Sequence, residues 1–146
     1  MPTVTGTRIK NCNKTGSHHD QLRDDRLERH PPCARLYDAL LAPFGGKRLM
    51  ELGPRGCLYA TGPGAPMLGI MMPHDGAPAR PGNGTMVAIA ADDRQQVDAM
   101  HANAMLLGAT DEGAPGPRGG ENSPFYGAYF RDLDGNKLAV FHWRRD

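Results

Sequence analysis

The sequence predicts an α+β fold built from two similar units, and three observations support this prediction. Each unit contains a segment of helical period followed by about three short strands that are separated by turns. The second unit has a further strand before its helix, so its order is strand, helix and three strands. Glycine (19 residues) and proline (13 residues) are frequent, as in folds with many short strands joined by turns.

The first unit begins with a helix that starts at Cys33. Pro43 and the glycines that follow it end this helix. The apolar side chains that share one helical face are Leu36, Tyr37, Leu40, Leu41 and Phe44. Short strands are expected within residues 47–52, 56–61 and 66–72, and residues 73–84 have the composition of a linker.

The second unit begins with a strand over residues 85–91, and the clearest helix of the chain follows over residues 92–108. Asp92 and Gln95 have the spacing of a capping box, with Asp92 as the expected N-cap. The remaining elements are a short strand at 109–113, a flexible loop at 115–124 and a hairpin at 125–143, whose turn is residues 132–136.

Length, charge and cysteine content exclude several classes of protein. The 146 residues suit one domain, and 17 basic against 16 acidic residues give a net charge of +1 without a block of one sign. Neither nucleic acid nor a membrane is therefore an expected partner. No apolar run has the length of a membrane helix or the character of a secretory signal. The three scattered cysteines argue against a disulfide framework and for a reducing cytoplasm.

Three stretches resemble the vicinal-oxygen-chelate superfamily, which includes glyoxalase, bleomycin-resistance proteins and extradiol dioxygenases. They are "LYDALLAPFGGKRL", "GNGTMVAIAADDRQQVDAMHANAMLLGATDEGAPGPRG" and "FYGAYFRDLDGNKLAVF". The resemblance extends roughly from Cys33 to Trp143. It implies paired βαβββ units whose mixed sheet curls into a cup, commonly completed by a second subunit, so a homodimer is expected. Members often bind a divalent metal through His, Gln or Glu side chains, and the metal acts as a Lewis acid.

Two of the superfamily's usual metal-ligand positions carry side chains that are not metal ligands of this kind. The carboxylate position in the last strand falls on Ala139, and the position in the strand before the second helix falls on or beside Met86. A methyl group cannot coordinate, and a thioether is a poor ligand for such metals. We therefore expect no cofactor and a small-molecule-binding protein similar to bleomycin-resistance proteins. The alternative is an enzyme with a divalent metal on non-standard ligands, either a lyase resembling lactoylglutathione lyase or a dioxygenase.

The period of 2 in the last strand places Ala139, Phe141 and Trp143 in the cup, and Leu138 and Val140 under the helices. The side chains expected to contact the ligand are Tyr59, Met86, Arg118, Tyr126, Tyr129, Phe141 and Trp143. A hydroxyl at Tyr129 fits related resistance enzymes, whereas a packed tyrosine is the competing interpretation. Arg118 can clamp an anionic group, and a solvated loop is its alternative.

The first unit has no recognisable strand before its helix, because residues 1–32 are polar and show no sustained period. One interpretation is a divergent, disordered tail. The other is a reading-frame shift within recorded residues 1–36, since shifting residues 18–36 by one nucleotide permits an alternating string that runs into Tyr37. We expect one domain at 33–146, with units at about 33–75 and 84–146. A chain made as written would leave a sheet edge of the first unit unpaired.

Overall fold

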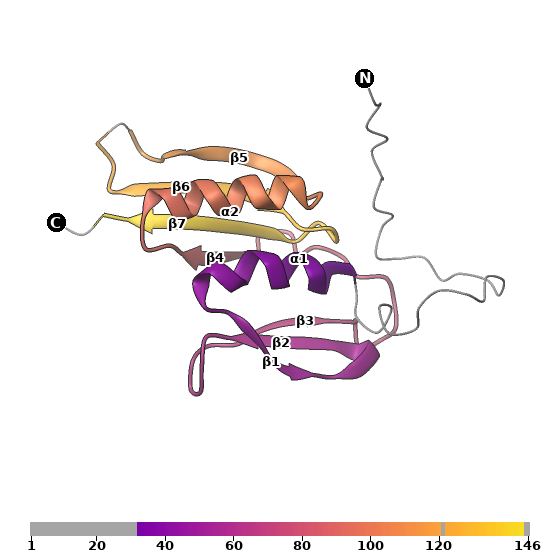
Figure 1. Cartoon of the computed structure of the whole chain (residues 1–146). Coiled ribbons are helices and arrows are strands. Elements are labelled where there is room, and N and C mark those ends of the chain that lie inside the picture. Colours follow the sequence, from indigo (N-terminus) through magenta and orange to yellow (C-terminus); the bar gives the residue numbers. More distant parts are fainter. Residues whose placement is uncertain (1–31, 121, 145–146) are drawn as a thin grey trace, which may run out of the picture.

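The computed structural model describes residues 32–120 and 122–144, which form two sheets and two α-helices (Figure 1). The helices and strands, in chain order, are α1 (Pro32–Leu41), β1 (Lys47–Glu51), β2 (Gly56–Ala60), β3 (Leu68–Met71), β4 (Met86–Ala90), α2 (Arg94–Leu106), β5 (Thr110–Pro117), β6 (Phe125–Arg131) and β7 (Lys137–Trp143). Two short 3₁₀ helices, Ala42–Phe44 and Gly53–Arg55, flank β1. The predicted α+β class is confirmed.

The two units share one order of elements. The first sheet has the order β1-β2-β3 with antiparallel pairs, and the second has the order β4-β7-β6-β5, in which β4 runs parallel to β7. The series α2-β5-β6-β7 therefore repeats α1-β1-β2-β3. No strand pairs with β3 as β4 pairs with β7 within residues 32–120 and 122–144. The two interpretations of the N-terminal segment fall on residues that mostly lie outside the described part of the chain. Residues 32–36, which the frame-shift interpretation also covers, form the start of α1, and Pro32 stands at a position where proline is well tolerated.

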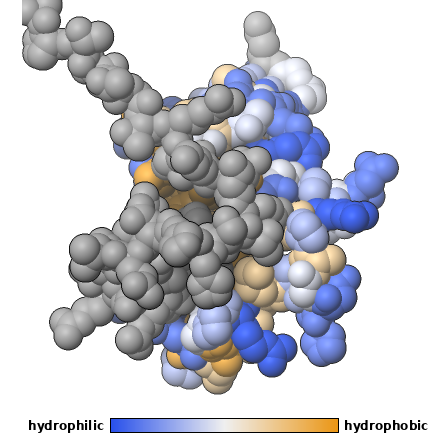
Figure 2. All heavy atoms as spheres, turned by 90° about the vertical axis from the view of Figure 1, so that its right-hand side faces the viewer, coloured by the Kyte–Doolittle hydropathy of each residue, from blue (hydrophilic) through white to orange (hydrophobic). Residues whose placement is uncertain are grey.

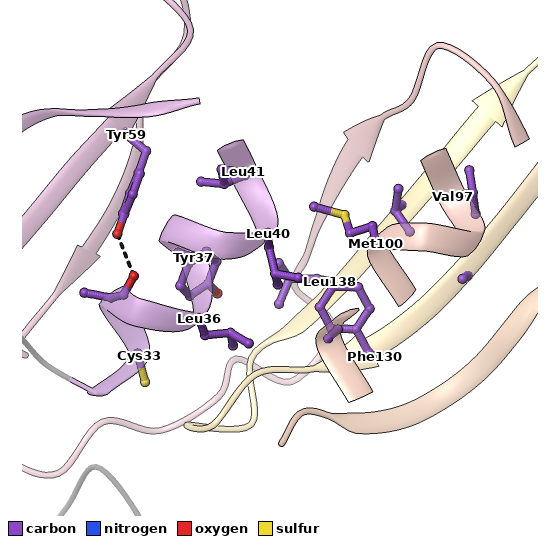
Figure 3. Packing of buried hydrophobic residues seen from close by; sticks show 14 of the residues in the cluster. Cys33, Leu36, Tyr37, Leu40, Leu41, Tyr59, Val97, Met100, Phe130 and Leu138 are labelled. Carbon is purple, nitrogen blue, oxygen red and sulfur yellow. Dashed lines mark hydrogen bonds between the residues drawn. The ribbon is translucent and has the colours of Figure 1, made fainter. Parts of the chain in front are cut away.

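The core lies where both helices pack on the sheets (Figure 3). The predicted face of α1 is confirmed, with Leu36, Tyr37 and Leu40 at most 3% exposed and Leu41 at 8%. The side chains of α2 that join this core are Val97, Met100 and Ala104. Those from β6 and β7 are Ala128, Phe130, Leu138 and Val140, which confirms the expected helix-facing parity of the last strand.

The turn between β6 and β7 is tied to the first helix through Asp132, which is 4% exposed. The Tyr37 hydroxyl donates to Asp132 Oδ2 at 2.7 Å, and the Asn136 side-chain amide donates to the same oxygen at 2.9 Å. The backbone N–H groups of Asp134 and Asn136 donate to Oδ1 at 3.0 and 2.8 Å. Burial and the neighbouring Asp132 raise the pKa of the Tyr37 hydroxyl far above its usual range.

The N-cap of α2 is Asp93, so the expected assignment to Asp92 was wrong by one residue. The Gln96 backbone N–H donates to Asp93 Oδ1 at 2.8 Å, and the Asp92 backbone N–H donates to Gln96 Oε1 at 2.9 Å. Two adjacent aspartates followed by two adjacent glutamines offer the capping-box spacing twice. The capping side chain stabilises the helix by about 1 kcal/mol.

Strand β5 is longer than the sequence indicates. It extends to Pro117, whereas residues 115–124 were expected to form a loop and the strand to end at 113. β5 is the edge strand of its sheet, and its register with β6 shifts twice, at Asp111/Gly113 and at Gly113/Gly116. Prolines are tolerated in such a strand because an edge leaves some backbone N–H positions unpaired.

Neither described helix is long and apolar enough to cross a membrane. Figure 2 views the molecule from the right-hand side of Figure 1. The described residues visible there present hydrophilic and apolar side chains side by side.

Candidate functional site

One face of the second sheet is covered by α2, and its opposite face, called here the open face, carries the candidate site (Figure 1). Side chains alternate across the strands, so residues paired with Ala139 lie on the open face with it. Those partners are Ala88 on β4 and Tyr129 on β6. The remaining open-face positions of β4, β6 and β7 are Met86, Ala90, Phe125, Gly127, Arg131, Lys137, Phe141 and Trp143.

Three aromatic side chains gather at one end of the open face. The rings of Phe125 and Phe141 stack with centroids 5.3 Å apart, and Trp143 meets Phe125 edge-on at 5.9 Å. Gly127 permits this arrangement, because a Cβ there would come within 2.9 Å of the Phe125 ring. Trp143 is 55% exposed, so an aromatic surface is available for a ligand to stack on.

Charged side chains gather at the other end of the open face. Glu112 pairs with the Nε of Arg131 and, at 3.1 Å, with the Nζ of Lys137. The hydrogen bond from Arg131, followed by that from Lys137, lowers the pKa of the Glu112 carboxyl. Two cations lie near the Tyr129 ring, Arg118 at 5.3 Å and Lys137 at 5.5 Å from its centroid.

A pocket of about 530 Å³ opens beside these charges. It is lined by Arg131 and Lys137, by Thr85 and Met86 at the start of β4, and by the preceding loop, residues 81–84. Its volume is in the range of small-molecule sites in proteins. The open face therefore offers an aromatic end, a middle of small side chains and a basic end with a pocket.

Comparison with known proteins identifies the family from solved structures, since no family model and no curated protein matches the chain. A glyoxalase/bleomycin resistance protein from Albidiferax ferrireducens T118 is 34% identical, with a TM-score of 0.67 over 80% of this chain and 92% of that chain. The chain belongs to the glyoxalase/bleomycin-resistance family. The resemblance to the vicinal-oxygen-chelate superfamily is thereby confirmed.

More distant members of this fold show the fold alone. A glyoxalase/bleomycin resistance protein/dioxygenase family enzyme from Burkholderia phytofirmans PsJN is 17% identical, with a TM-score of 0.58 over 77% of this chain and 89% of that chain. Lactoylglutathione lyase from Agrobacterium tumefaciens is 20% identical, with a TM-score of 0.52 over 76% of this chain and 83% of that chain.

Five of the seven expected ligand contacts lie together on the open face of this family member. They are Met86, Arg118, Tyr129, Phe141 and Trp143. Arg118 follows the end of β5, and its guanidinium reaches back over Tyr129 while donating to the Ala114 carbonyl at 2.6 Å.

The other two expected contacts, Tyr59 and Tyr126, point elsewhere. Tyr59 is 2% exposed beneath α1, where its hydroxyl oxygen lies 2.9 Å from the Ala34 carbonyl and 2.8 Å from Asp38 Oδ1, two acceptors that share its single proton. Tyr126 faces α2, because its hydroxyl donates to Asp98 at 2.8 Å and Arg94 lies over its ring at 5.0 Å. Tyr126 differs in parity from Tyr129, so the alternation of a strand turns the two side chains to opposite faces.

Lys137 and Glu112 lie at the site but are not among the side chains expected there from the sequence. Lys137 stands two residues before Ala139, so the period of 2 in β7 was a sufficient signal for it. Glu112 lies within a register shift of β5, and strand parity in a sequence does not reveal such irregularities.

The described residues do not fit the family's type of metal centre. Ala139 is 1% exposed between the two strands that flank it, and Met86 carries only a thioether sulfur. Across residues 32–120 and 122–144, no three His, Cys, Asp or Glu side chains form a group that could hold a metal ion. The third usual ligand position precedes α1 and lies outside these residues.

Proposed function

We propose that this protein binds a small organic molecule on the open face without using a metal ion. The observation that carries the proposal is the aromatic cluster of Phe125, Phe141 and Trp143 on the same face as the 530 Å³ pocket. Rings of this kind bind ligands by burial of apolar area and by stacking. The family includes bleomycin-resistance proteins. Sequestration of a small molecule needs no metal ion, which is consistent with Ala139 and Met86 at two of the usual metal-ligand positions.

The one tyrosine of the open face, Tyr129, has its ring beside Arg118 and Lys137 and outside the aromatic cluster. The Tyr126 hydroxyl, a second candidate for acid–base chemistry, is turned to α2 and bonded to Asp98. Lys137 and Arg131 are held by Glu112, which suits electrostatic binding rather than proton transfer. Binding is therefore favoured over catalysis for this family member.

Ligand binding is expected to change the fluorescence of Trp143, which is the single tryptophan of the chain. A panel of small aromatic and aliphatic molecules, neutral and charged, is titrated into protein treated with a chelator. At least one member should give a saturable change, and Phe141→Ala should weaken its binding about tenfold, since one aromatic contact contributes about 1 kcal/mol or more. The matched control is Tyr126→Phe, which removes a hydroxyl on the opposite face and should leave the affinity unchanged.

Metal analysis of the untreated protein separates this proposal from its alternative. Near-zero metal content with unchanged binding after chelation supports a metal-independent binder. About one divalent ion per chain, together with binding that is lost on chelation and restored by metal, would instead support the lyase or dioxygenase with non-standard ligands.

A homodimer is part of the proposal, because the first sheet exposes apolar side chains on the face turned away from α1. Cys57 and Tyr59 face α1, so the alternating positions face outward, as do their partners on β1 and β3. Among these outward residues Met50 is 51% exposed and Met71 is 41% exposed, and Met67, next to β3, is 59% exposed. Exposed apolar side chains that lie together mark interaction surfaces, and methionine adapts readily to a partner.

Sedimentation analysis is expected to show a dimer that Met50→Glu combined with Met67→Glu converts to monomer. Burying two added carboxylates in a self-complementary interface costs several kcal/mol, which exceeds the margin of a modest dimer. Leu106→Glu is the matched control, because Leu106 is 86% exposed on α2 and lies away from this face. Dimers that persist equally in both variants would show that the first sheet does not form the interface.

A further inference from the structure

We propose that the ligand of the open face is an amphipathic anion, whose anionic group binds at Arg131 and Lys137 while its apolar part lies on the aromatic cluster. This inference rests on the proposed function and adds the chemical class of the ligand. A carboxylate, a sulfonate and a phosphonate share the chemistry that such a basic site recognises.

The charge on the open face is positive even after its internal pairs are counted. Among residues 32–120 and 122–144, Arg131 and Lys137 share one carboxylate, Glu112, and a third cation, Arg118, lies over the neighbouring Tyr129 ring. The chain as a whole has a net charge of only +1, so the excess of cations here is a local feature. A pocket lined by one sign of charge attracts small ions of the opposite sign, and Arg131 and Lys137 line such a pocket.

The cations retain N–H donors that no hydrogen bond within residues 32–120 and 122–144 uses. Arg131 donates through Nε to Glu112 and through Nη1 to the Gly135 carbonyl at 2.8 Å, which leaves its Nη2 for a ligand. Lys137 gives Glu112 one contact at 3.1 Å, and an ammonium has three N–H donors. Both side chains are about a third exposed, at 33% and 34%, and both line the 530 Å³ pocket.

The pocket adds polar groups that suit an anion. Thr85 contributes a hydroxyl, and the adjacent loop contains Gly82 and Gly84, whose missing side chains leave the backbone open to a ligand. The part of the chain that the structure describes contributes no carboxylate to the lining of this pocket, so none of its anions competes for the cations on that side. Glu112 approaches them from the direction of β5 instead.

The two ends of the open face set the length of the ligand. Lys137 and Phe141 lie four residues apart on β7, which separates their Cα atoms by about 13 Å. Between them the small side chain of Ala88 on β4 is exposed, whereas its partner Ala139 is only 1% exposed, so a ligand crosses the sheet over Ala88. The Lys137 side chain covers several ångströms of that separation, so a ring linked to an anion by a short chain fits both ends.

Calorimetric titration with 6-phenylhexanoate and with 6-phenylhexan-1-ol tests the inference, because the two probes differ essentially in charge. The carboxylate is expected to bind at least tenfold more tightly than the alcohol, and its affinity should fall as salt is added. Lys137→Met should remove most of this preference. Lys47→Met, the same substitution on an exposed lysine of β1, should leave it unchanged.

Glu112→Gln is a second variant, and it is expected to strengthen the binding of 6-phenylhexanoate instead of weakening it. It keeps the shape of the side chain and releases the cations, so 6-phenylhexanoate should bind threefold or more tightly than to the unaltered protein. Damage to the fold alone would not strengthen binding. Equal affinities for the two probes would overturn the anionic ligand and leave the proposed binding function standing. Failure of both probes and of the wider ligand panel to bind would overturn both.

Discussion

Replacing Asp132 by alanine is expected to lower the free energy of unfolding by about 3 kcal/mol or more, because four donors lose one buried acceptor. Those donors are the Tyr37 hydroxyl, the side-chain amide of Asn136 and the backbone N–H groups of Asp134 and Asn136. The substitution removes the hydrogen bonds within the β6–β7 turn and also the hydrogen bond from Tyr37 that connects the turn to α1. Chemical denaturation monitored by circular dichroism measures it.

Tyr37→Phe separates the two parts of this effect. It removes only the hydroxyl of a side chain that is 3% exposed, and it leaves the turn with its own three hydrogen bonds. The expected cost is about 1 kcal/mol. In the double variant the two losses should not add, since both include the same 2.7 Å hydrogen bond. A loss below about 1 kcal/mol for Asp132→Ala would contradict this role for the turn.

The order of elements was predictable from the sequence because periodicity reports burial on one face. The apolar positions of α1 follow a helical period, and the alternation of Leu138 and Val140 with Phe141 and Trp143 follows a strand period. In both elements the large side chains that the period selects are buried, and small side chains outside that pattern, Ala34 in α1 and Ala139 in β7, are buried as well. The same rule, applied to β7 two residues earlier, places Lys137 on the open face.

The site was less predictable because a period identifies two faces without saying which one a helix covers. Tyr59 illustrates this limit, since α1 packs on the side of β2 that carries Cys57 and Tyr59. Tyr126 shows the opposite case, because its parity opposes that of Tyr129 and its side chain lies on the face that α2 covers. Contacts across a bulge, such as those of Glu112, depend on a register that only the folded sheet defines.

The basic end of the open face offers an explanation for Ala139 and Met86, which stand at two of the family's usual metal-ligand positions. A divalent ion in this family would supply positive charge to the oxygens of a substrate. In this chain the same face carries alanine at residue 139, and Lys137 lies two residues away on the same strand. Fixed side-chain cations thus offer electrostatic attraction for an anion without coordination chemistry, which agrees with a binding role.

Replacing Gly56 by alanine is expected to destabilise the protein by about 4 kcal/mol, since two costs coincide at this residue. A Cβ there would lie 2.1 Å from the carbonyl oxygen of Ile70 and 2.9 Å from the Cα of Met71. Both atoms belong to the backbone of β3, so no side-chain rotation relieves the overlap. The residue also has φ +130° and ψ −159°, a conformation that is essentially restricted to glycine.

Gly53→Ala is the matched control for this prediction. Gly53 lies in the same turn with φ +60°, and a Cβ there would have no atom within 4 Å. Gly53→Ala should cost only about 1 kcal/mol, which is the cost of placing alanine in a positive-φ conformation without any steric overlap. Hydrogen exchange should then show lost protection across β2 and β3 in Gly56→Ala alone, because the added methyl group separates these two strands. Equal denaturation midpoints for the two variants would show that β3 does not pack against Gly56 as described. The first sheet, with its exposed methionines, would then need a different pairing.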